Sequence, residues 1–299
     1  MAPTPRLTAA DFDQELLILF DAYVHGDIDR RGFLDKAAKF AVGGITAAGL
    51  LAALSPDFAI AQVVPQGDPR ITTERIDVDS PNGSGKVKAY LAKPAKASGK
   101  LPTVLVVHEN RGLNPHIEDI ARRLAVDGYL ALAPDALTPL GGYPGDEDKA
   151  RALFAQLDQS KTRQDFLAAA AVLKARADGT GKLGVVGFCY GGGMAHFLAT
   201  QLPDLAAAVP FYGNHPPVED AAKVKAPLLI HFAAVDDRIN AAWPAYEAAL
   251  KAAGVRYTAH QYPGTQHGFN NDTTPRFDAA AAKLAWDRTL AFFAQHLKA

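Results

Sequence analysis

The chain contains very little cysteine: Cys189 is the only one among its 299 residues. A single thiol excludes an intrachain disulfide framework, and it leaves too few ligands for a thiolate-rich metal site. Charge of one sign is also lacking, because 31 Lys and Arg stand against 32 Asp and Glu, a formal net charge of −1. Without a basic stripe there is no electrostatic case for nucleic acid as a partner. We therefore expect a small-molecule partner, and no metal or cofactor is required.

Long hydrophobic runs are lacking too. Residues 41–54 are uncharged and apolar, and the next charge is Asp57, which makes the stretch too short and too rich in Gly and Ala for a membrane span. We expect no stable membrane insertion of the mature domain. The stretch follows Arg30-Arg31-Gly32-Phe33-Leu34 and precedes Ala59-Ile60-Ala61. This order resembles a twin-arginine export signal cleaved after Ala61, which predicts a leader over residues 1–65 and a periplasmic or exported protein.

A second interpretation of the same region stays open. Residues 9–24 have the apolar spacing of an amphipathic helix, which makes an unusually long leader. Asp35 also follows Leu34 where a lysine is commoner in such signals. The alternative is therefore a cytoplasmic protein that retains its N-terminal helices. Sequencing of the native N-terminus distinguishes the two, since cleavage would leave Gln62 as the first residue.

The remainder, residues 66–299, has the pattern of one α/β domain. Residues 74–79 and 87–92 alternate polar and apolar around Pro81-Asn82-Gly83, which predicts an antiparallel hairpin. Residues 103–108 form a continuous apolar run typical of a strand buried on both faces. Further strands are expected at 129–133, 182–187, 206–211, 227–233 and 256–262, and helices at 115–127, 146–157, 161–177, 191–202, 242–253 and 276–298. Such alternation predicts a mostly parallel sheet, covered by helices on both faces, with the hairpin as its antiparallel edge.

The one cysteine lies at a strand-to-helix junction, in Gly187-Phe188-Cys189-Tyr190-Gly191. Gly-x-Cys-x-Gly between a strand and a helix is the nucleophile-elbow pattern with Cys in place of Ser. The glycines leave room for a strained turn, and the helix N-terminus favours a thiolate. The backbone N–H of Tyr190 is then a candidate oxyanion donor.

A base and an acid follow in the order that this architecture requires. Asp236 comes after strand 227–233, and His267 comes after strand 256–262. Both lie past strand ends on the same rim as Cys189, so Cys189, His267 and Asp236 are predicted to form a triad. Asp237 competes with Asp236, but its neighbour Arg238 offers it a simple loop ion pair. Of the other histidines, two are expected to pack in the core, His196 and His231. The rest show no partner pattern: His25, His116, His215, His260 and His296.

These motifs resemble the dienelactone hydrolase family of the α/β-hydrolase superfamily over about residues 70–298. The resemblance rests on His108-Glu109-Asn110-Arg111-Gly112-Leu113-Asn114, the cysteine elbow, Phe211-Tyr212-Gly213 and His267-Gly268-Phe269. It implies an α/β-hydrolase fold and a Cys-His-Asp triad. It also implies that Glu109 contacts the resting cysteine and helps to convert it to thiolate.

The resemblance further implies that the backbone N–H of Asn110 is the second oxyanion donor and that Tyr212 lies near the substrate. There are departures. Well-known members of the family hold a substrate carboxylate with two arginines, one of them four residues after the catalytic histidine, where this chain has Asn271. The other would lie in the loop 137–148, which contains Tyr143 but no arginine. Arg111 is the candidate replacement, and dienelactone itself does not carry over as the substrate.

We therefore predict a hydrolase of a small ester or lactone that acts through an acyl-thioester on Cys189. One alternative is a peroxide-sensing thiol protein, which fits a thiolate at a helix N-terminus but lacks a resolving cysteine. Another is a non-catalytic binding module of the same fold, for which the three triad residues would be incidental. The sequence leaves the oligomeric state open.

Overall fold

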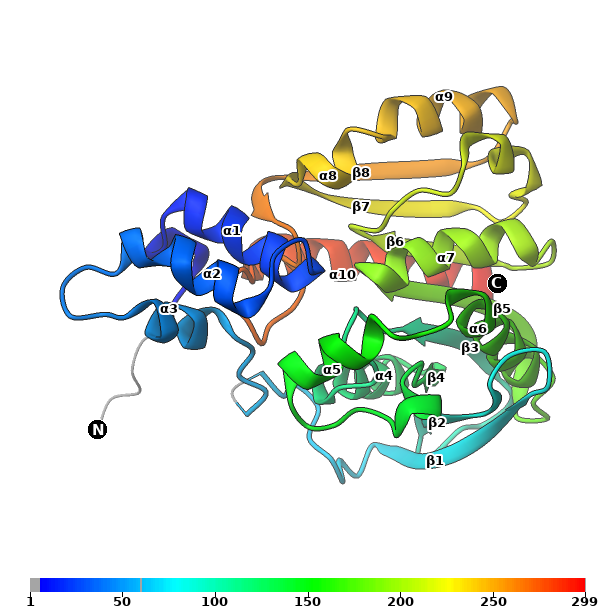
Figure 1. The fold of residues 1–299 in the computed structure, drawn as a ribbon. Helices are drawn as coiled ribbons and strands as arrows, with labels where there is room; N and C mark the ends of the chain where they lie inside the picture. The colour runs from blue at the N-terminus through cyan, green and yellow to red at the C-terminus, as the bar shows by residue number, and fades with distance from the viewer. Residues whose placement is uncertain (1–5, 60, 299) are drawn as a thin grey trace.

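The structure, a computed structural model, describes residues 6–59 and 61–298. Its centre is an eight-stranded sheet in the order β1-β2-β4-β3-β5-β6-β7-β8 (Figure 1). The strands are β1 (Ile71–Ser80), β2 (Gly85–Pro94), β3 (Leu101–Val107), β4 (Leu130–Pro134), β5 (Gly179–Phe188), β6 (Ala207–Phe211), β7 (Leu228–Val235) and β8 (Tyr257–Gln266). The predicted α/β-hydrolase fold is confirmed.

The antiparallel part of the sheet lies at the predicted edge. β1 and β2 form the hairpin, with Ser80 opposite Gly85 next to the turn, and β2 also pairs antiparallel with β4. All pairs from β4 through β3 to β8 are parallel. Parallel strands end at the same edge, so the loops after β3, β5, β7 and β8 meet on one rim, where the predicted site residues lie.

Helices cover both faces of the sheet, as the strand-helix alternation predicts. α4 (Pro115–Val126) and α10 (Ala279–Phe293) pack on one face, and their buried apolar residues share a core with Val104 and Val186. α6 (Gln159–Lys174), α7 (Tyr190–Gln201) and α9 (Trp243–Ala252) pack on the other face. The short helices α5 (Glu147–Phe154) and α8 (Asp237–Asn240), the turns η3 (Thr138–Leu140) and η4 (Val218–Lys223), and the terminal π-turn η5 (Ala294–Lys298) complete this domain.

Residues 6–59, here called the N-terminal segment, form three helices with a small core of their own. These are α1 (Gln14–His25), α2 (Arg30–Ala37) and α3 (Ala47–Leu54), with the turn η1 (Ala9–Asp11) before α1 and the turn η2 (Ala38–Phe40) between α2 and α3. Phe33 and Leu54 are completely buried in this core. The helices lie together at one end of the sheet (Figure 1, blue). The predicted helix over 9–24 thus corresponds to η1 and α1, and the apolar stretch 41–54 contains α3.

Several predicted elements differ in extent by a few residues, among them β8 and the final helix. The strand expected at 256–262 continues to Gln266, because the β7–β8 pairing resumes after an irregularity and places Val235 opposite Gln266. The final helix begins at Ala279, where the Asp278 side chain caps its first turn, rather than at 276. Among the described residues, no helix is long and apolar enough to cross a membrane.

Candidate active site

Cys189 lies in the turn between β5 and α7, in a backbone conformation that few side-chain-bearing residues adopt. Its φ is 56° and its ψ is −113°. A Cβ on Gly187 would lie 1.9 Å from the carbonyl oxygen of Gly191, and one on Gly191 would lie 2.2 Å from that of Val107. Both positions therefore exclude any side chain. This is the steric requirement of a nucleophile elbow, which lifts the sulfur to the rim of the sheet.

Asp236 and His267 are brought together beside it. The side chain of Asp236, which follows β7, accepts a hydrogen bond from Nδ1 of His267 at 2.5 Å. Both are buried, with side chains 2% and 4% exposed. Asp237, by contrast, begins α8 and is exposed. Asp236 is thus the acid that orients the imidazole. The Nε2 atom of His267 is buried and has no hydrogen-bond partner among the described residues, so it is free to face a reacting group.

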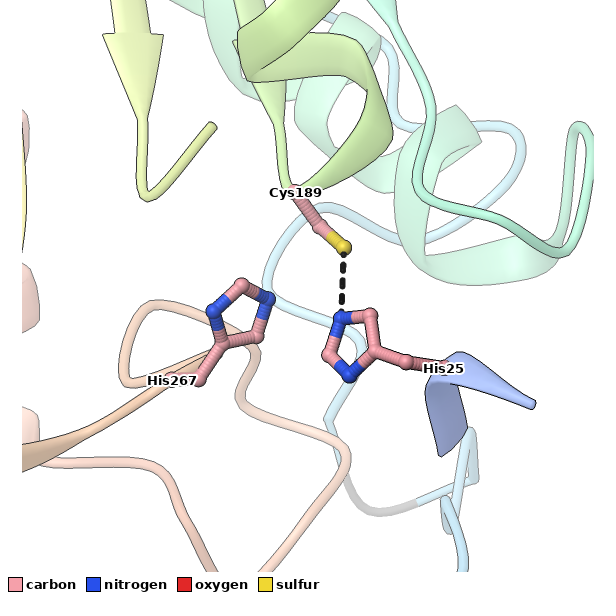
Figure 2. Close-up of side chains that lie close together, drawn as sticks. All are labelled: His25, Cys189 and His267. Atoms are coloured by element: carbon pink, nitrogen blue, oxygen red, sulfur yellow. Dashed lines mark hydrogen bonds between the residues drawn. The ribbon is translucent and has the colours of Figure 1, made fainter. Parts of the chain in front are cut away.

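The Cys189 sulfur points toward two neighbouring imidazole rings, those of His25 and His267 (Figure 2). Nε2 of His25, the last residue of α1, is 3.4 Å from Sγ. A ring nitrogen of His267 lies within 4.8 Å of the sulfur, a separation that one bridging water or a small side-chain rotation closes. The two rings meet edge to face, with centroids 4.7 Å apart. His25, which shows no partner pattern in the sequence, is therefore a neighbour of the predicted nucleophile.

The two histidines determine the electrostatics of the thiol. Burial raises the pKa of Cys189, but the nearby charges of His267 and His25 outweigh it and lower that pKa to about 6. Burial alone would lower the pKa of His267, whereas Cys189 and the Asp236 hydrogen bond raise it to about 10. The pKa of His25 is raised in the same way, by Cys189 and Asp21 against burial. The cluster therefore favours a thiolate paired with imidazolium near neutral pH.

Glu109 and the two predicted oxyanion donors lie on the same rim. Oε2 of Glu109 accepts a hydrogen bond from the amide of Asn271 at 2.8 Å, so the residue that replaces an expected arginine holds this carboxylate. Glu109 and Cys189 line a common cavity. Tyr190 is the first residue of α7, where a backbone N–H has no helical acceptor. Asn110 directly follows Glu109 after β3. The roles of Glu109, Tyr190 and Asn110 stay predictions.

Two of the three predicted substrate-binding residues, Arg111 and Tyr143, are hydrogen-bonded within the protein. Arg111 is buried and donates to Oδ1 of Asn110 at 2.7 Å and to the carbonyl of Val24 at 3.3 Å. Tyr143 donates to Oε1 of Glu147 at 2.9 Å. Tyr212 has a positive φ of 37°, and its buried hydroxyl has no partner among the described residues. Its ring lies 4.9 Å from that of His267. The proximity of Tyr212 to the triad agrees with its predicted place, but none of the three contacts tests substrate binding.

Cys189 lines two cavities on different sides. A cavity of about 330 Å³ opens toward α7 and the segment after β6, and Tyr190, Met194, Asn214 and His215 are among its lining residues. The second, of about 50 Å³, lies toward Glu109 and Arg111, and Tyr23 and Val24 of α1 are among its lining residues. Drug-sized ligands use pockets of about 300–1,000 Å³, whereas one water occupies about 30 Å³. Only the larger cavity has room for a small ester.

Among the described residues, one group has metal-ligand atoms close together: His25, Cys189 and His267, all within 4.8 Å of one another. However, Nη2 of Arg238 lies 3.0 Å from Nε2 of His25. In the neutral ring this contact uses the lone pair of Nε2, which is the lone pair that a metal ion would need. The arrangement is better explained as a hydrogen-bonded thiolate–imidazole cluster, and we assign no metal to it.

The position of His25 has almost no signal in the sequence. The residue ends an amphipathic helix and precedes Gly26, the left-handed C-cap of α1, which marks only a helix end. The contact joins residues 164 positions apart. The local sequence around His25 cannot predict a contact between residues so far apart in the chain, because the contact depends on how the N-terminal segment docks on the rim of the sheet.

Comparisons with known proteins agree with this geometry. A family model described as the dienelactone hydrolase family matches residues 87–297, and one described as YqhI-like matches residues 3–40. The "Putative hydrolase fragment YghX" of Escherichia coli K12 is 58% identical over 114 residues, which cover 38% of this chain and 97% of that protein. A "Putative carboxymethylenebutenolidase" of Salmonella typhi is 35% identical over 231 residues, which cover 72% of this chain and 85% of that protein.

A solved structure described as a "Putative Dienelactone Hydrolase" from Klebsiella pneumoniae superposes with a TM-score of 0.69 at 33% identity, covering 75% of this chain and 99% of that one. The family match therefore spans the sheet from β2 onward, the elbow and the loops that carry Asp236 and His267, while the N-terminal segment and β1 lie outside it. With the α/β-hydrolase fold and a family match over more than half of its length, the chain belongs to the dienelactone hydrolase family and is an ester or lactone hydrolase.

Proposed function

We propose that this hydrolase uses Cys189 as a nucleophile and forms an acyl-thioester. One observation carries the proposal: the thiol of a sterically enforced elbow lies beside a buried histidine whose other ring nitrogen is bound by Asp236 at 2.5 Å. A nucleophile, a base and a group that orients the base are the parts that covalent acyl transfer requires.

The reaction begins with attack of the Cys189 thiolate on the substrate carbonyl carbon. The backbone N–H groups of Tyr190 and Asn110 stabilise the oxyanion, where the loss of one such donor typically costs about 3–4 kcal/mol. The imidazolium of His267 protonates the leaving oxygen. Neutral His267 then removes a proton from water, which attacks the thioester and expels the thiolate, a step in which general-base catalysis contributes about 10²–10⁴-fold. Asp236 holds the imidazole orientation throughout.

The substrate we propose is a small ester or lactone that enters through the cavity of about 330 Å³. A thiolate is a good leaving group, so the tetrahedral intermediate returns to reactants unless the substrate's own leaving group is also stable. Enolates and aryl oxides satisfy this condition, whereas amines do not. We therefore propose that activated esters and enol lactones are cleaved and peptides are not.

We also propose that the N-terminal segment stays attached to the mature protein, which favours the cytoplasmic alternative over export. Phe33 of the twin-arginine motif is completely buried, and Arg30 pairs with Asp148 at 2.7 Å. Ile60, within the predicted cleavage site, lies outside the described residues. Just beyond that site, the N–H of Val64 donates to buried Asp119 of α4 at 2.8 Å. N-terminal sequencing of the native protein tests this, and Gln62 as the first residue would support the exported form.

Turnover of p-nitrophenyl acetate and of an enol lactone tests the mechanism. Cys189→Ala and His267→Ala should each lose nearly all activity, whereas His260→Ala, a matched control on β8, should keep it. Intact-mass spectrometry of a rapidly quenched reaction should show an acyl adduct on the wild type and none on Cys189→Ala. Full turnover by Cys189→Ala would exclude the mechanism. Peroxide reactivity without any ester hydrolysis would favour the thiol sensor.

A further inference from the structure

A second histidine–aspartate pair points at Cys189, and it comes from the N-terminal segment. Nδ1 of His25 donates to the backbone carbonyl of Asp21 at 2.8 Å and lies 3.3 Å from its carboxylate. Nε2 of the same ring faces Sγ at 3.4 Å (Figure 2). The arrangement parallels Asp236–His267, since in each case an aspartate holds Nδ1 and leaves Nε2 toward the sulfur. Two such pairs therefore flank one nucleophile.

Several contacts hold the end of α1 in this position. The carbonyl of Val24 accepts hydrogen bonds from Nδ2 of Asn110 at 2.9 Å and from Arg111 at 3.3 Å. Asp21 pairs with Arg276 at 3.0 Å. The guanidinium of Arg151 lies over the ring of Tyr23, 3.9 Å from its centroid. Because these partners come from three separate parts of the catalytic domain, the location of His25 is specified by several independent contacts.

The charges around His25 favour different protonation states. Asp21 favours the imidazolium and Arg238 opposes it, while Cys189 and His267 are the other titratable groups in contact with the ring. Nε2 carries either one hydrogen or one lone pair, so it cannot donate to Sγ and accept from Arg238 in the same state. Since Nδ1 needs its hydrogen for the Asp21 carbonyl, donation to the sulfur requires the imidazolium. Farther from Sγ, Glu109 and Arg111 line the smaller cavity with Cys189.

We propose that the Asp21–His25 pair is part of the active site and stabilises the Cys189 thiolate through a hydrogen bond from Nε2 of His25 to Sγ. This rests on the proposed nucleophilic role of Cys189. The step is a single proton transfer, in which the Sγ–H bond breaks and an Nε2–H bond forms. Because the thiol proton goes to His25, the Nε2 hydrogen of the His267 imidazolium remains for the leaving oxygen of the substrate. The N-terminal segment thereby contributes a residue that touches the reacting atom.

His25 does not fill the space that a substrate needs. Its neighbours on α1, Tyr23 and Val24, line the cavity of about 50 Å³, on the Glu109 side. The cavity of about 330 Å³ reaches Cys189 from the α7 side, and no residue of the N-terminal segment is among its lining residues in the described chain. The sulfur can therefore be reached from the α7 side while the hydrogen bond from His25 is in place, with Tyr190 lining this approach and Asn110 and His267 lining the smaller cavity.

The pH dependence of Cys189 alkylation by iodoacetamide tests the proposal directly. Cys189 is the only cysteine, so the modification reports one site without background. In His25→Gln, which removes the charge and keeps a similar volume, the midpoint of the alkylation profile should rise by about one pH unit. Below both midpoints this means an alkylation rate about tenfold lower. Asp21→Asn should shift the midpoint in the same direction by less, and His260→Gln should not shift it.

The outcomes separate a charge effect from a steric one. If His25 only shields the sulfur, His25→Gln will alkylate faster at every pH with an unchanged midpoint, and the proposal is overturned. A rise in kcat of His25→Gln would likewise overturn it, since the side chain would then be an obstacle. The expected result is a lower kcat near pH 6.5 with a smaller change in KM. The alkylation profile is measured without substrate turnover. It therefore still tests the effect of His25 on Cys189 if Cys189→Ala keeps its activity and the proposed function fails.

Discussion

The two regions of this molecule are stabilised in different ways. The catalytic domain buries apolar residues on both faces of a sheet, in two extensive cores. The N-terminal segment has one small core of three short helices, and near the active site its contacts with the domain are mostly polar, such as Asp21–Arg276 and Arg30–Asp148. Apolar burial sets the stability of each region, whereas directional polar contacts set how one lies on the other.

The two histidine–aspartate pairs show the same contrast at the scale of one site. In Asp236–His267 both side chains are at most 4% exposed, and the hydrogen bond is 2.5 Å long. In Asp21–His25 the side chains are 25% and 11% exposed, and the carboxylate contact is 3.3 Å. Water screens the second pair more strongly, so its aspartate should matter less. The buried pair fits the proposed role in acyl transfer, and the more exposed pair fits the proposed effect on the charge of the thiol.

The largest expected effect comes from breaking the buried pair. Asp236→Asn removes the charge that orients His267 and should lower kcat by about 10⁴-fold, as the equivalent change does in serine triads. Asp21→Asn should lower kcat by less than about tenfold, because the backbone carbonyl still holds Nδ1 of His25. Steady-state kinetics on p-nitrophenyl acetate measures both. Similar losses in the two variants would contradict the contrast between the pairs.

The second prediction separates the two cores. Phe33→Ala deletes a fully buried ring from the N-terminal core and should destabilise that segment by about 3–5 kcal/mol. Amide hydrogen exchange should then rise in α1 to α3 and stay unchanged in β3, β5 and β6. Phe188→Ala, a matched change in the sheet core, should raise exchange throughout the catalytic domain. Faster exchange of the sheet in Phe33→Ala would show that the two regions unfold as one unit.

The sequence predicts the catalytic domain well for a physical reason. The sequence features that predict this domain are local. The apolar run Val104 to Val107 predicts a buried strand, and Gly187 and Gly191 mark places where two backbone segments lie too close for any side chain. Asp236 and His267 follow strand ends, and parallel strands bring those ends to one rim. The fold and the grouping of the triad residues follow from such rules without any tertiary information.

The location of the N-terminal segment does not follow from local rules. His25 meets Cys189 because Asn110, Arg111, Arg151 and Arg276 each bind part of α1, and none of these pairs is close in sequence. The contact of Asn271 with Glu109 is hidden for the same reason. Contacts between side chains on separate elements produce no periodic pattern in the sequence. The sequence can therefore single out such a residue, but it does not predict which residue it will contact.

The third prediction concerns pH. The pKa of Cys189 is lowered to about 6, so ionisation of this thiol stabilises the folded protein. This contribution is fully present at pH values above the ordinary thiol pKa of about 8.5, and it is lost as the pH falls through about 6. The pKa of His267 is raised to about 10, so protonation of this ring also stabilises the folded protein. This contribution is fully present below pH 6.5 and is lost as the pH rises through about 10. A profile of kcat/KM against pH should therefore have limbs near 6 and 10 that belong to the coupled pair. In His25→Gln the acidic limb should move up while the basic limb stays in place.

The smallest expected effect tests an exposed contact between the regions. Arg30 and Asp148 pair at 2.7 Å with side chains 55% and 39% exposed, and such pairs typically contribute about 0–1 kcal/mol. Arg30→Gln should therefore leave thermal unfolding and kcat nearly unchanged. Arg276, the partner of Asp21, is more buried than Arg30. Arg276→Gln should therefore shift the midpoint of the Cys189 alkylation profile to higher pH, because Asp21 would be held less firmly beside His25. Equal behaviour of the two variants would mean that the segment is held as a rigid body by its apolar contacts, and that the polar contacts do not set the position of His25.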